Sequence, residues 1–162
     1  MTTLFLAVTL LLGMVGGAPV PSFVEPQITG SPLQTDEITV GGVPLTVELA
    51  YLPVDTSLGL GYREGLAPGT GMLFLFEGPA PRTFWMRGMQ FCIDIVWIEN
   101  SVIQGAAESV CPEPASTADA DLPSYVSPVP VTYVLEVPAG WLDAYGLEAG
   151  TLVEGLPSLA RP

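Results

Sequence analysis

Residues 71–98 decide the fold and read GMLFLFEGPAPRTFWMRGMQFCIDIVWI. Two apolar runs, at 72–76 and 91–98, flank a turn rich in Gly and Pro and then the tripeptide Phe84-Trp85-Met86. Apolar runs of this length, rich in Ile, Phe and Trp and bounded by turn residues, are typical of buried β-strands. The stretch therefore predicts a pair of strands at the centre of a β framework.

The chain on either side of this stretch predicts further short strands and little helix. Side chains at 45–50 alternate between apolar and polar, which indicates a strand with one face in water. Strands are also expected at 102–110, 131–137 and 152–153, and short helices at about 56–63 and 139–145. The sum is a mainly β (β-rich α+β) domain: a small sandwich or partly closed barrel of short strands with two short helices.

The charge balance of the 162-residue chain excludes several classes of protein. There are 17 acidic residues against four Arg, with no Lys and no His, and the net charge is -13. Nucleic acids and anionic lipids attract Lys and Arg, so we expect no nucleic-acid partner and no membrane contact beyond the N-terminal segment. Without His the chain has no Ser-His-Asp or Cys-His pair and no His-bearing zinc site. Two Cys are too few for a Cys-rich metal site, and no cofactor is expected.

Changes in composition divide the chain into segments. An apolar run at 4–15 ends in small residues, so residues 1–18 are expected to be a signal peptide or a membrane anchor. Residues 19–42 are rich in Pro and Gly and are interpreted as a linker, with room for one edge strand near 37–40. Residues 43–156 are expected to form the β domain, and 157–162 a loose tail. The N-terminal segment predicts an extracytoplasmic protein, whether secreted, periplasmic or membrane-anchored.

Five spaced motifs carry a resemblance to a known protein family. They are Gly59-Leu60 with Arg63, GMLFLF at 71–76, FWMRGM at 84–89, DIVWI at 94–98 and YVLEVPAG at 133–140. Together they resemble the DUF192 (UPF0127) family over about residues 43–154. The resemblance implies a small, mainly β domain of a kind that is often exported or membrane-anchored. It implies no activity, because the family has no established biochemical function.

Asp94 is the charged side chain in an otherwise apolar run, and two interpretations stay open. A buried carboxylate is costly unless it is paired, so Asp94 is expected to form an ion pair with Arg63 or Arg87 that holds the motif region together. Alternatively, Asp94 is a general acid or base with a raised pKa, and Glu136 is the second carboxyl of a catalytic pair. The first interpretation is structural and the second is enzymatic.

The aromatic segment around Trp85 is a second candidate site. Aromatic side chains on a β framework either fill a small core or stack against sugars and apolar peptides. Trp85 and Met86 stand among turn residues rather than in mid-strand, so they are expected to reach the surface. The candidate binding surface comprises Arg63, Trp85, Met86, Arg87 and Asp94.

The two Cys form a third candidate. If Asn100-Ser101 is a tight turn, Cys92 and Cys111 lie near each other on paired strands. They are then either joined in a disulfide, which would suit an exported protein, or are two buried thiols.

The acidic loop at 113–122 is the last candidate. Its carboxylates could serve as oxygen ligands for calcium, which favours such groups. An exposed, solvated acidic loop fits the same composition. The weak metal candidates are Glu113, Asp119 and Asp121.

These observations favour a non-catalytic extracytoplasmic module that serves in binding or structure in the cell envelope. Its expected partner is an envelope protein or a glycan. One alternative is a carboxylate-dependent hydrolase that acts on a glycan through Asp94 and Glu136. The other alternative is a calcium-binding module that uses the acidic loop.

Overall fold

The computed structural model describes residues 32–159. These residues belong to a compact unit that spans Ser31–Pro162. The predictions of a signal peptide or anchor, of most of the linker and of the end of the tail fall on residues 1–31 and 160–162, outside the described part. Within the described part, no helix is both long enough and apolar enough to cross a membrane.

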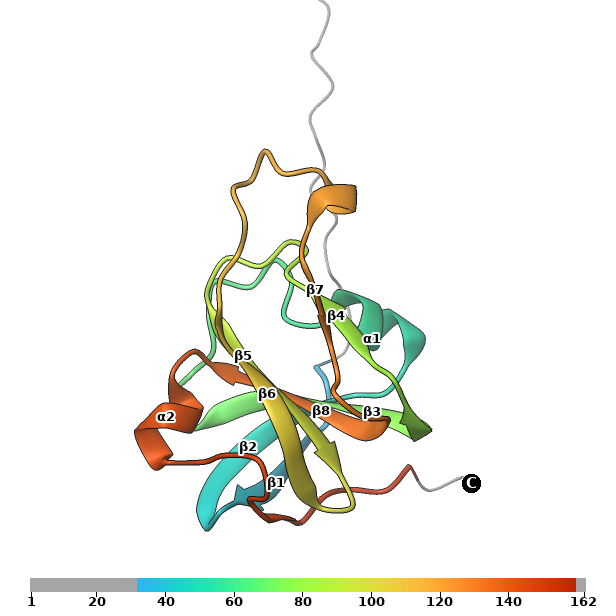
Figure 1. The fold of residues 1–162 in the computed structure, drawn as a ribbon, viewed down its shortest axis with the longest axis vertical. Helices are drawn as coiled ribbons and strands as arrows, with labels where there is room; N and C mark the ends of the chain where they lie inside the picture. Colours follow the sequence, from blue (N-terminus) through green and yellow to red (C-terminus); the bar gives the residue numbers. More distant parts are fainter. Residues whose placement is uncertain (1–31, 160–162) are drawn as a thin grey trace, which may run out of the picture. The chain divides into compact units, whose positions relative to one another are not determined.

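A curled sheet of seven strands forms the body of the fold, as Figure 1 shows. Its strand order is β6-β5-β8-β3-β2-β1-β9. The strands are β1 (Thr35–Val40), β2 (Val43–Ala50), β3 (Thr70–Ala80), β5 (Ile93–Glu99), β6 (Val102–Val110), β8 (Val131–Pro138) and β9 (Val153–Glu154). A separate two-stranded sheet joins β4 (Thr83–Trp85) to β7 (Ser124–Val126). The main sheet curls into a half-barrel, which confirms the prediction of a small, mainly β domain.

Two short helices connect the strands, α1 (Pro53–Leu58) and α2 (Trp141–Tyr145). β2 and β3 are parallel, and parallel neighbours need a crossover, which α1 and the loop after it provide. α1 begins earlier than the predicted 56–63, because Pro53 is tolerated in its first turn and Gly59, with φ of 53°, ends it. A short 3-10 helix, η1 (Asp119–Asp121), lies in the acidic loop.

β1 lies inside the segment that was interpreted as a linker, so the sheet begins before residue 43. β1 and β2 form a hairpin whose turn residues, Gly41 and Gly42, have φ of 57° and 84°. A two-residue hairpin turn favours Gly at such left-handed positions. β1 is a full member of the sheet because it also pairs with β9 on its other side.

Alternation along the strands divides the buried side chains into two clusters on opposite faces of the sheet. The first cluster contains Val96, Ile98, Leu135, Val137, Trp141 and Leu142, and thus packs against α2. The second contains Met72, Phe74, Met86, Ile95, Trp97 and Val134, with Phe84 of β4 packed against it. The predicted alternation along 91–98 is therefore present, and each face of β5 belongs to a different cluster.

Candidate functional site

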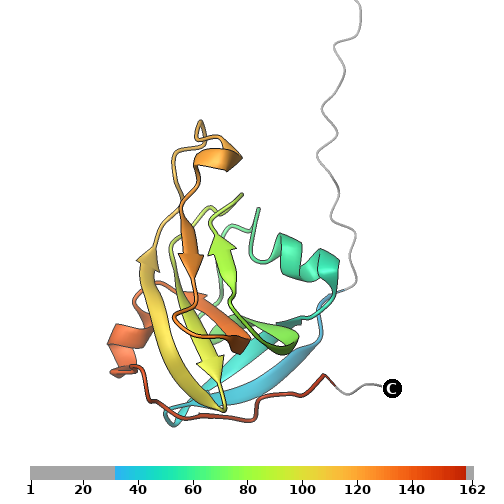
Figure 2. The same ribbon diagram turned by 45° about the vertical axis from the view of Figure 1, so that its right-hand side comes forward.

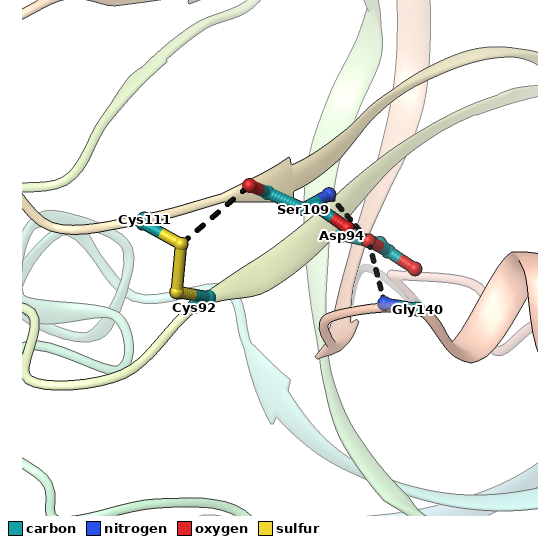
Figure 3. The surroundings of a disulfide bond; sticks show 5 residues. All are labelled: Cys92, Asp94, Ser109, Cys111 and Gly140. Carbon is teal, nitrogen blue, oxygen red and sulfur yellow. Dashed lines mark hydrogen bonds between the residues drawn. A yellow bond between two sulfur atoms is a disulfide. The ribbon is translucent and has the colours of Figure 1, made fainter.

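Asp94 on β5 is fully buried and holds three backbone segments together. Its Oδ1 accepts hydrogen bonds from the backbone N–H groups of Ser109 (2.7 Å) and Gly140 (3.1 Å), and its Oδ2 accepts one from Leu142 (3.1 Å). Figure 3 shows Asp94 between Ser109 and Gly140. Ser109 lies at a bulge in β6, whereas the other two donors lie at the start of α2. Asp94 thus accepts hydrogen bonds from backbone N–H groups at places where the regular hydrogen bonding between strands is interrupted.

The predicted ion pair of Asp94 with Arg63 or Arg87 is wrong. Arg63 forms a bidentate pair with Glu48 on β2, with N–O distances of 2.8 and 2.7 Å. Arg87 pairs with Asp119 of η1, with Nε 2.9 Å from Oδ2. Asp94 does need buried partners, but backbone amides far along the chain supply them in place of a cation. With no exposed surface, Asp94 is not part of a binding surface.

Asp94 and Glu136 do not form the pair that the enzymatic interpretation requires. In the antiparallel pairing of β5 with β8, Asp94 is opposite Val137, whereas Glu136 is opposite Ile95. Successive residues of a strand point to opposite faces, so the sheet separates the two carboxyl groups. Asp94 lies on the face that packs against α2, and Glu136 lies on the face that β4 covers.

Among the residues that the structure describes, Glu136 has a buried side-chain oxygen, Oε2, without a hydrogen-bond partner. The residue is only 5% exposed. Burial disfavours the charged form and raises the pKa of Glu136 to about 8, although the nearby Arg63 guanidinium acts to lower it. At neutral pH the carboxyl group is therefore mostly protonated, and it can donate as well as accept a hydrogen bond.

A small hollow of about 40 Å³ lies at Glu136, and we call it the Glu136 pocket. The end of α1 with the turn after it lines the pocket, as do β4 and the turn after it. Figures 1 and 2 show α1 and β4 as neighbouring elements. Gly59 lies near the carboxyl group: a Cβ atom there would be 3.3 Å from the Phe74 ring and 4.0 Å from Oε2 of Glu136. The positive φ of 53° and the tight contact with the Phe74 ring both favour glycine at this position.

Aromatic rings form the inner wall of the Glu136 pocket. Phe84 packs edge-on against Phe74, with 4.9 Å between ring centroids, and against Trp97, with 5.6 Å. These contacts anchor β4 to the sheet through Phe84. Met89 adds to this apolar part of the lining, while Thr56, Ser57 and Arg87 line the pocket as well. None of these side chains forms a hydrogen bond with Oε2 of Glu136.

Trp85 and Met86 differ in exposure, which corrects part of the predicted surface. Trp85 is 46% exposed and lies at the rim of the Glu136 pocket. Met86 is only 3% exposed and packs in the second core cluster, so the prediction that it reaches the surface is wrong. Arg87 does reach the surface, and its guanidinium carbon lies 5.6 Å from the centroid of the Trp85 ring.

Two broader hollows adjoin the Glu136 pocket. One, of about 270 Å³, is lined by α1, Tyr62 and Arg87, and Arg87 also lines the Glu136 pocket. The other, of about 310 Å³, lies between Tyr62, Met89 and the acidic loop. We call this region the Trp85 surface and define it by Val54, Tyr62, Trp85 and Arg87.

Sequence reasoning missed Val54 and Tyr62. Val54 is 67% exposed and Tyr62 is 61% exposed, so both are large apolar side chains in contact with solvent. The Tyr62 backbone N–H donates to the carbonyl of Gly88 at 2.8 Å, which fixes the turn after α1 against the turn after β4. This long-range contact has no signal in the local sequence of either turn.

Cys92 and Cys111 form a disulfide bond, shown in Figure 3. Register shifts between β5 and β6 accompany the bulge at Ser109, and Ile93 is thereby opposite Val110. Cys92 immediately precedes Ile93 and Cys111 immediately follows Val110, so the two Cys are neighbours, with their Cα atoms 4.1 Å apart. The tight turn expected at Asn100-Ser101 is present, with both residues at positive φ.

The acidic loop does not gather its carboxylates. Asp119 is engaged with Arg87, with side chains that are both more than half exposed. Over residues 32–159, no group of three or more His, Cys, Asp or Glu side chains is arranged to hold a metal ion. The candidates Glu113, Asp119 and Asp121 are thus not brought together as a ligand set.

Comparisons with known proteins find one family and similar solved structures. The sequence profile of the DUF192 family, described as Uncharacterized ACR, COG1430, matches residues 36–155. A protein from Sinorhizobium meliloti 1021, proposed to be a transcription regulator, has a crystal structure with a TM-score of 0.69 and 30% identity, over 77% of this chain and 96% of that one. A protein of unknown function from Novosphingobium aromaticivorans DSM 12444 has a TM-score of 0.67 and 28% identity, over 86% and 94%. No curated protein matches the chain.

Proposed function

This chain belongs to the DUF192 family, which is uncharacterised, and we propose that it is a non-catalytic extracytoplasmic module that binds a polypeptide partner of the cell envelope. The binding site in this proposal is the Trp85 surface. The observation that carries the proposal is the grouping of exposed apolar side chains around adjoining hollows at one place on the domain.

The composition of the Trp85 surface supports a role in binding. Val54, Tyr62 and Trp85 are 67%, 61% and 46% exposed. Removal of large apolar groups from water is favourable, so a partner that covers them would be stabilised. Trp, Tyr and Arg are the residues that most often carry binding energy at protein interfaces. Several of them around a shared depression mark a site for a partner.

The location outside the cytoplasm rests on two features that are independent of each other. The apolar run at 4–15 is typical of a secretory signal or a short anchor. The disulfide between Cys92 and Cys111 is of a kind that persists in oxidising compartments. Both features support export of the domain.

A glycan hydrolase receives less support than a binding module. Such an enzyme needs two carboxyl groups that face each other across one cleft. Asp94 is saturated by backbone amides on the face opposite to Glu136, so it cannot be the second group. Glu136 alone, in a pocket of about 40 Å³, offers no room for a sugar ring between two acids.

Arrays of peptides and of glycans, probed with the oxidised protein, test the proposal. We expect a subset of peptides to retain the wild-type protein and to lose the variant Trp85→Ala. Tyr145→Ala is the matched control, because Tyr145 is 55% exposed on α2 and lies outside the Trp85 surface. Binding to glycans in place of peptides, or peptide binding that Trp85→Ala leaves unchanged, would contradict the proposal.

A further inference from the structure

Glu136 gives the pocket beneath the Trp85 surface a chemical preference of its own. We infer that the Glu136 pocket takes one primary alkylammonium group, carried by a lysine side chain of the polypeptide partner, with the Glu136 carboxylate as its counterion. This inference rests on the proposed function and names the group that the Trp85 surface selects.

The first support is the unmatched hydrogen-bonding capacity of Glu136. Its Oε2 is buried, lacks a partner and lies near Gly59, which lines the pocket. Buried polar groups in native proteins are nearly always hydrogen-bonded, so an orphaned oxygen at the end of a hollow indicates a site for a donor. A charged donor suits a carboxyl best, because the resulting ion pair offsets the cost of burying the negative charge.

The second support is the size and lining of the pocket. Its volume of about 40 Å³ exceeds the roughly 10–15 Å³ that one water molecule needs on the same measure, so an ammonium group fits. A planar guanidinium is wider and is less suited to so small a pocket. Phe84, Trp85 and Met89 offer an apolar wall for the methylene groups of a lysine.

The third support is the charge of the surroundings. Arg63 and Arg87, the cations nearest to the pocket, are each held by a carboxylate of their own, Glu48 and Asp119. Glu136 is buried and forms no ion pair with an Arg among residues 32–159. The chain as a whole carries a net charge of -13 and has no lysine to compete for the pocket. Such a charge draws basic partners and repels acidic ones.

Binding of this kind is coupled to a proton. In the protein without ligand the pKa of Glu136 is about 8, because the effect of burial outweighs the opposing effect of the Arg63 guanidinium. An ammonium next to the carboxylate lowers that pKa, so near pH 7 the Glu136 proton passes to solvent while the bound amine keeps its own. The apparent affinity then rises about tenfold from pH 6 to pH 7 and levels off above pH 8.

Titration calorimetry with defined probes tests the inference. The probes are Nα-acetyl-lysine-N-methylamide, its uncharged analogue Nα-acetyl-norleucine-N-methylamide, and n-butylammonium chloride. We expect the lysine probe to bind at least tenfold more tightly than the norleucine probe, and to bind more tightly than n-butylammonium. Repeating the titration in buffers of different ionisation enthalpy at pH 7 should show the release of close to one proton per lysine bound.

The variant Glu136→Gln keeps the shape of the side chain and removes its negative charge. It should weaken binding of the lysine probe at least tenfold and abolish the proton release. Glu148→Gln is the matched control, because it makes the same charge change at an exposed position. The wild-type proton count gives a second test that does not depend on how well Glu136→Gln folds.

The outcomes separate this inference from the proposed function. If Glu136→Gln binds the lysine probe as the wild type does, or if the norleucine probe binds equally well, the inference fails. Equal binding of n-butylammonium would make a free amine the ligand and would contradict a lysine of a partner. In each of these cases the Trp85-dependent binding of peptides on the arrays remains as a separate readout of the proposed function.

Discussion

Asp94 and Glu136 lie one residue out of register on the paired strands β5 and β8, and the sheet therefore places them on opposite faces. The two carboxyl groups are about equally buried, at 0% and 5% exposure, but their surroundings differ completely. Asp94 accepts three backbone hydrogen bonds, whereas one oxygen of Glu136 accepts none. The first group therefore stabilises the fold, and the second is free to act on a ligand.

Asp94→Asn should destabilise the domain by about 2–4 kcal/mol, because an amide nitrogen cannot accept the hydrogen bonds that a carboxylate oxygen accepts. At least one of the three backbone N–H groups, those of Ser109, Gly140 and Leu142, then remains unpaired in the core. Urea unfolding at pH 7 measures the change. Asp143→Asn, at an exposed position of α2, is the control, and equal stability of the two variants would contradict a structural role for Asp94.

Glu136 should make the domain less stable as the pH rises. Its pKa goes from 4.5 in the unfolded chain to about 8 in the folded state, so the folded state binds more protons between these two values. At about 1.4 kcal/mol per pH unit, this contribution falls by up to about 5 kcal/mol from pH 4.5 to pH 8 and is then constant. Urea unfolding of the wild type and of Glu136→Gln across pH 5–9 isolates it. A stability difference between them that does not change with pH would exclude a raised pKa.

Arg63→Met should raise the pKa of Glu136 above its wild-type value. The Arg63 guanidinium, held by Glu48, stabilises the charged form of Glu136, and Met preserves much of the apolar contact without the charge. The carboxyl carbon chemical shift of Glu136, followed by NMR against pH, measures the change. Arg82→Met removes a charge near Phe76 and should leave the titration of Glu136 where it is. An unchanged or lower pKa in Arg63→Met would contradict the stabilisation of charged Glu136 by Arg63.

Loss of the disulfide should cost about 3 kcal/mol of stability, since the bridge joins residues that are 19 apart in sequence. The double variant Cys92→Ser and Cys111→Ser and the reduced wild-type protein should show similar decreases in urea unfolding. Mass spectrometry after alkylation without reductant provides the direct check. Two alkylated thiols in protein exported to an oxidising compartment would contradict the pairing.

Local patterns in the sequence were sufficient for the long central strands β3, β5 and β8 and for the family. The apolar runs of β3, β5 and β8 are long and bounded by turn residues, and burial of such runs depends little on what lies opposite. The alternation along β5 also placed Asp94 and Trp97 on different faces. The start of α1 was less well predicted, because a short helix owes its position to packing more than to propensity.

The sequence by itself determined that Asp94 is buried among apolar residues, that the domain is mainly β and that it is strongly acidic. Only the tertiary structure decided which groups satisfy Asp94, since its donors at Ser109 and Leu142 are 15 and 48 residues away. It also decided that the turn after α1 lies against the turn after β4, which creates the Trp85 surface and leaves Glu136 without a partner. The physical reason is that burial follows from the composition of a segment, whereas the partner of a buried polar group depends on strand register and on contacts between segments that are distant in sequence.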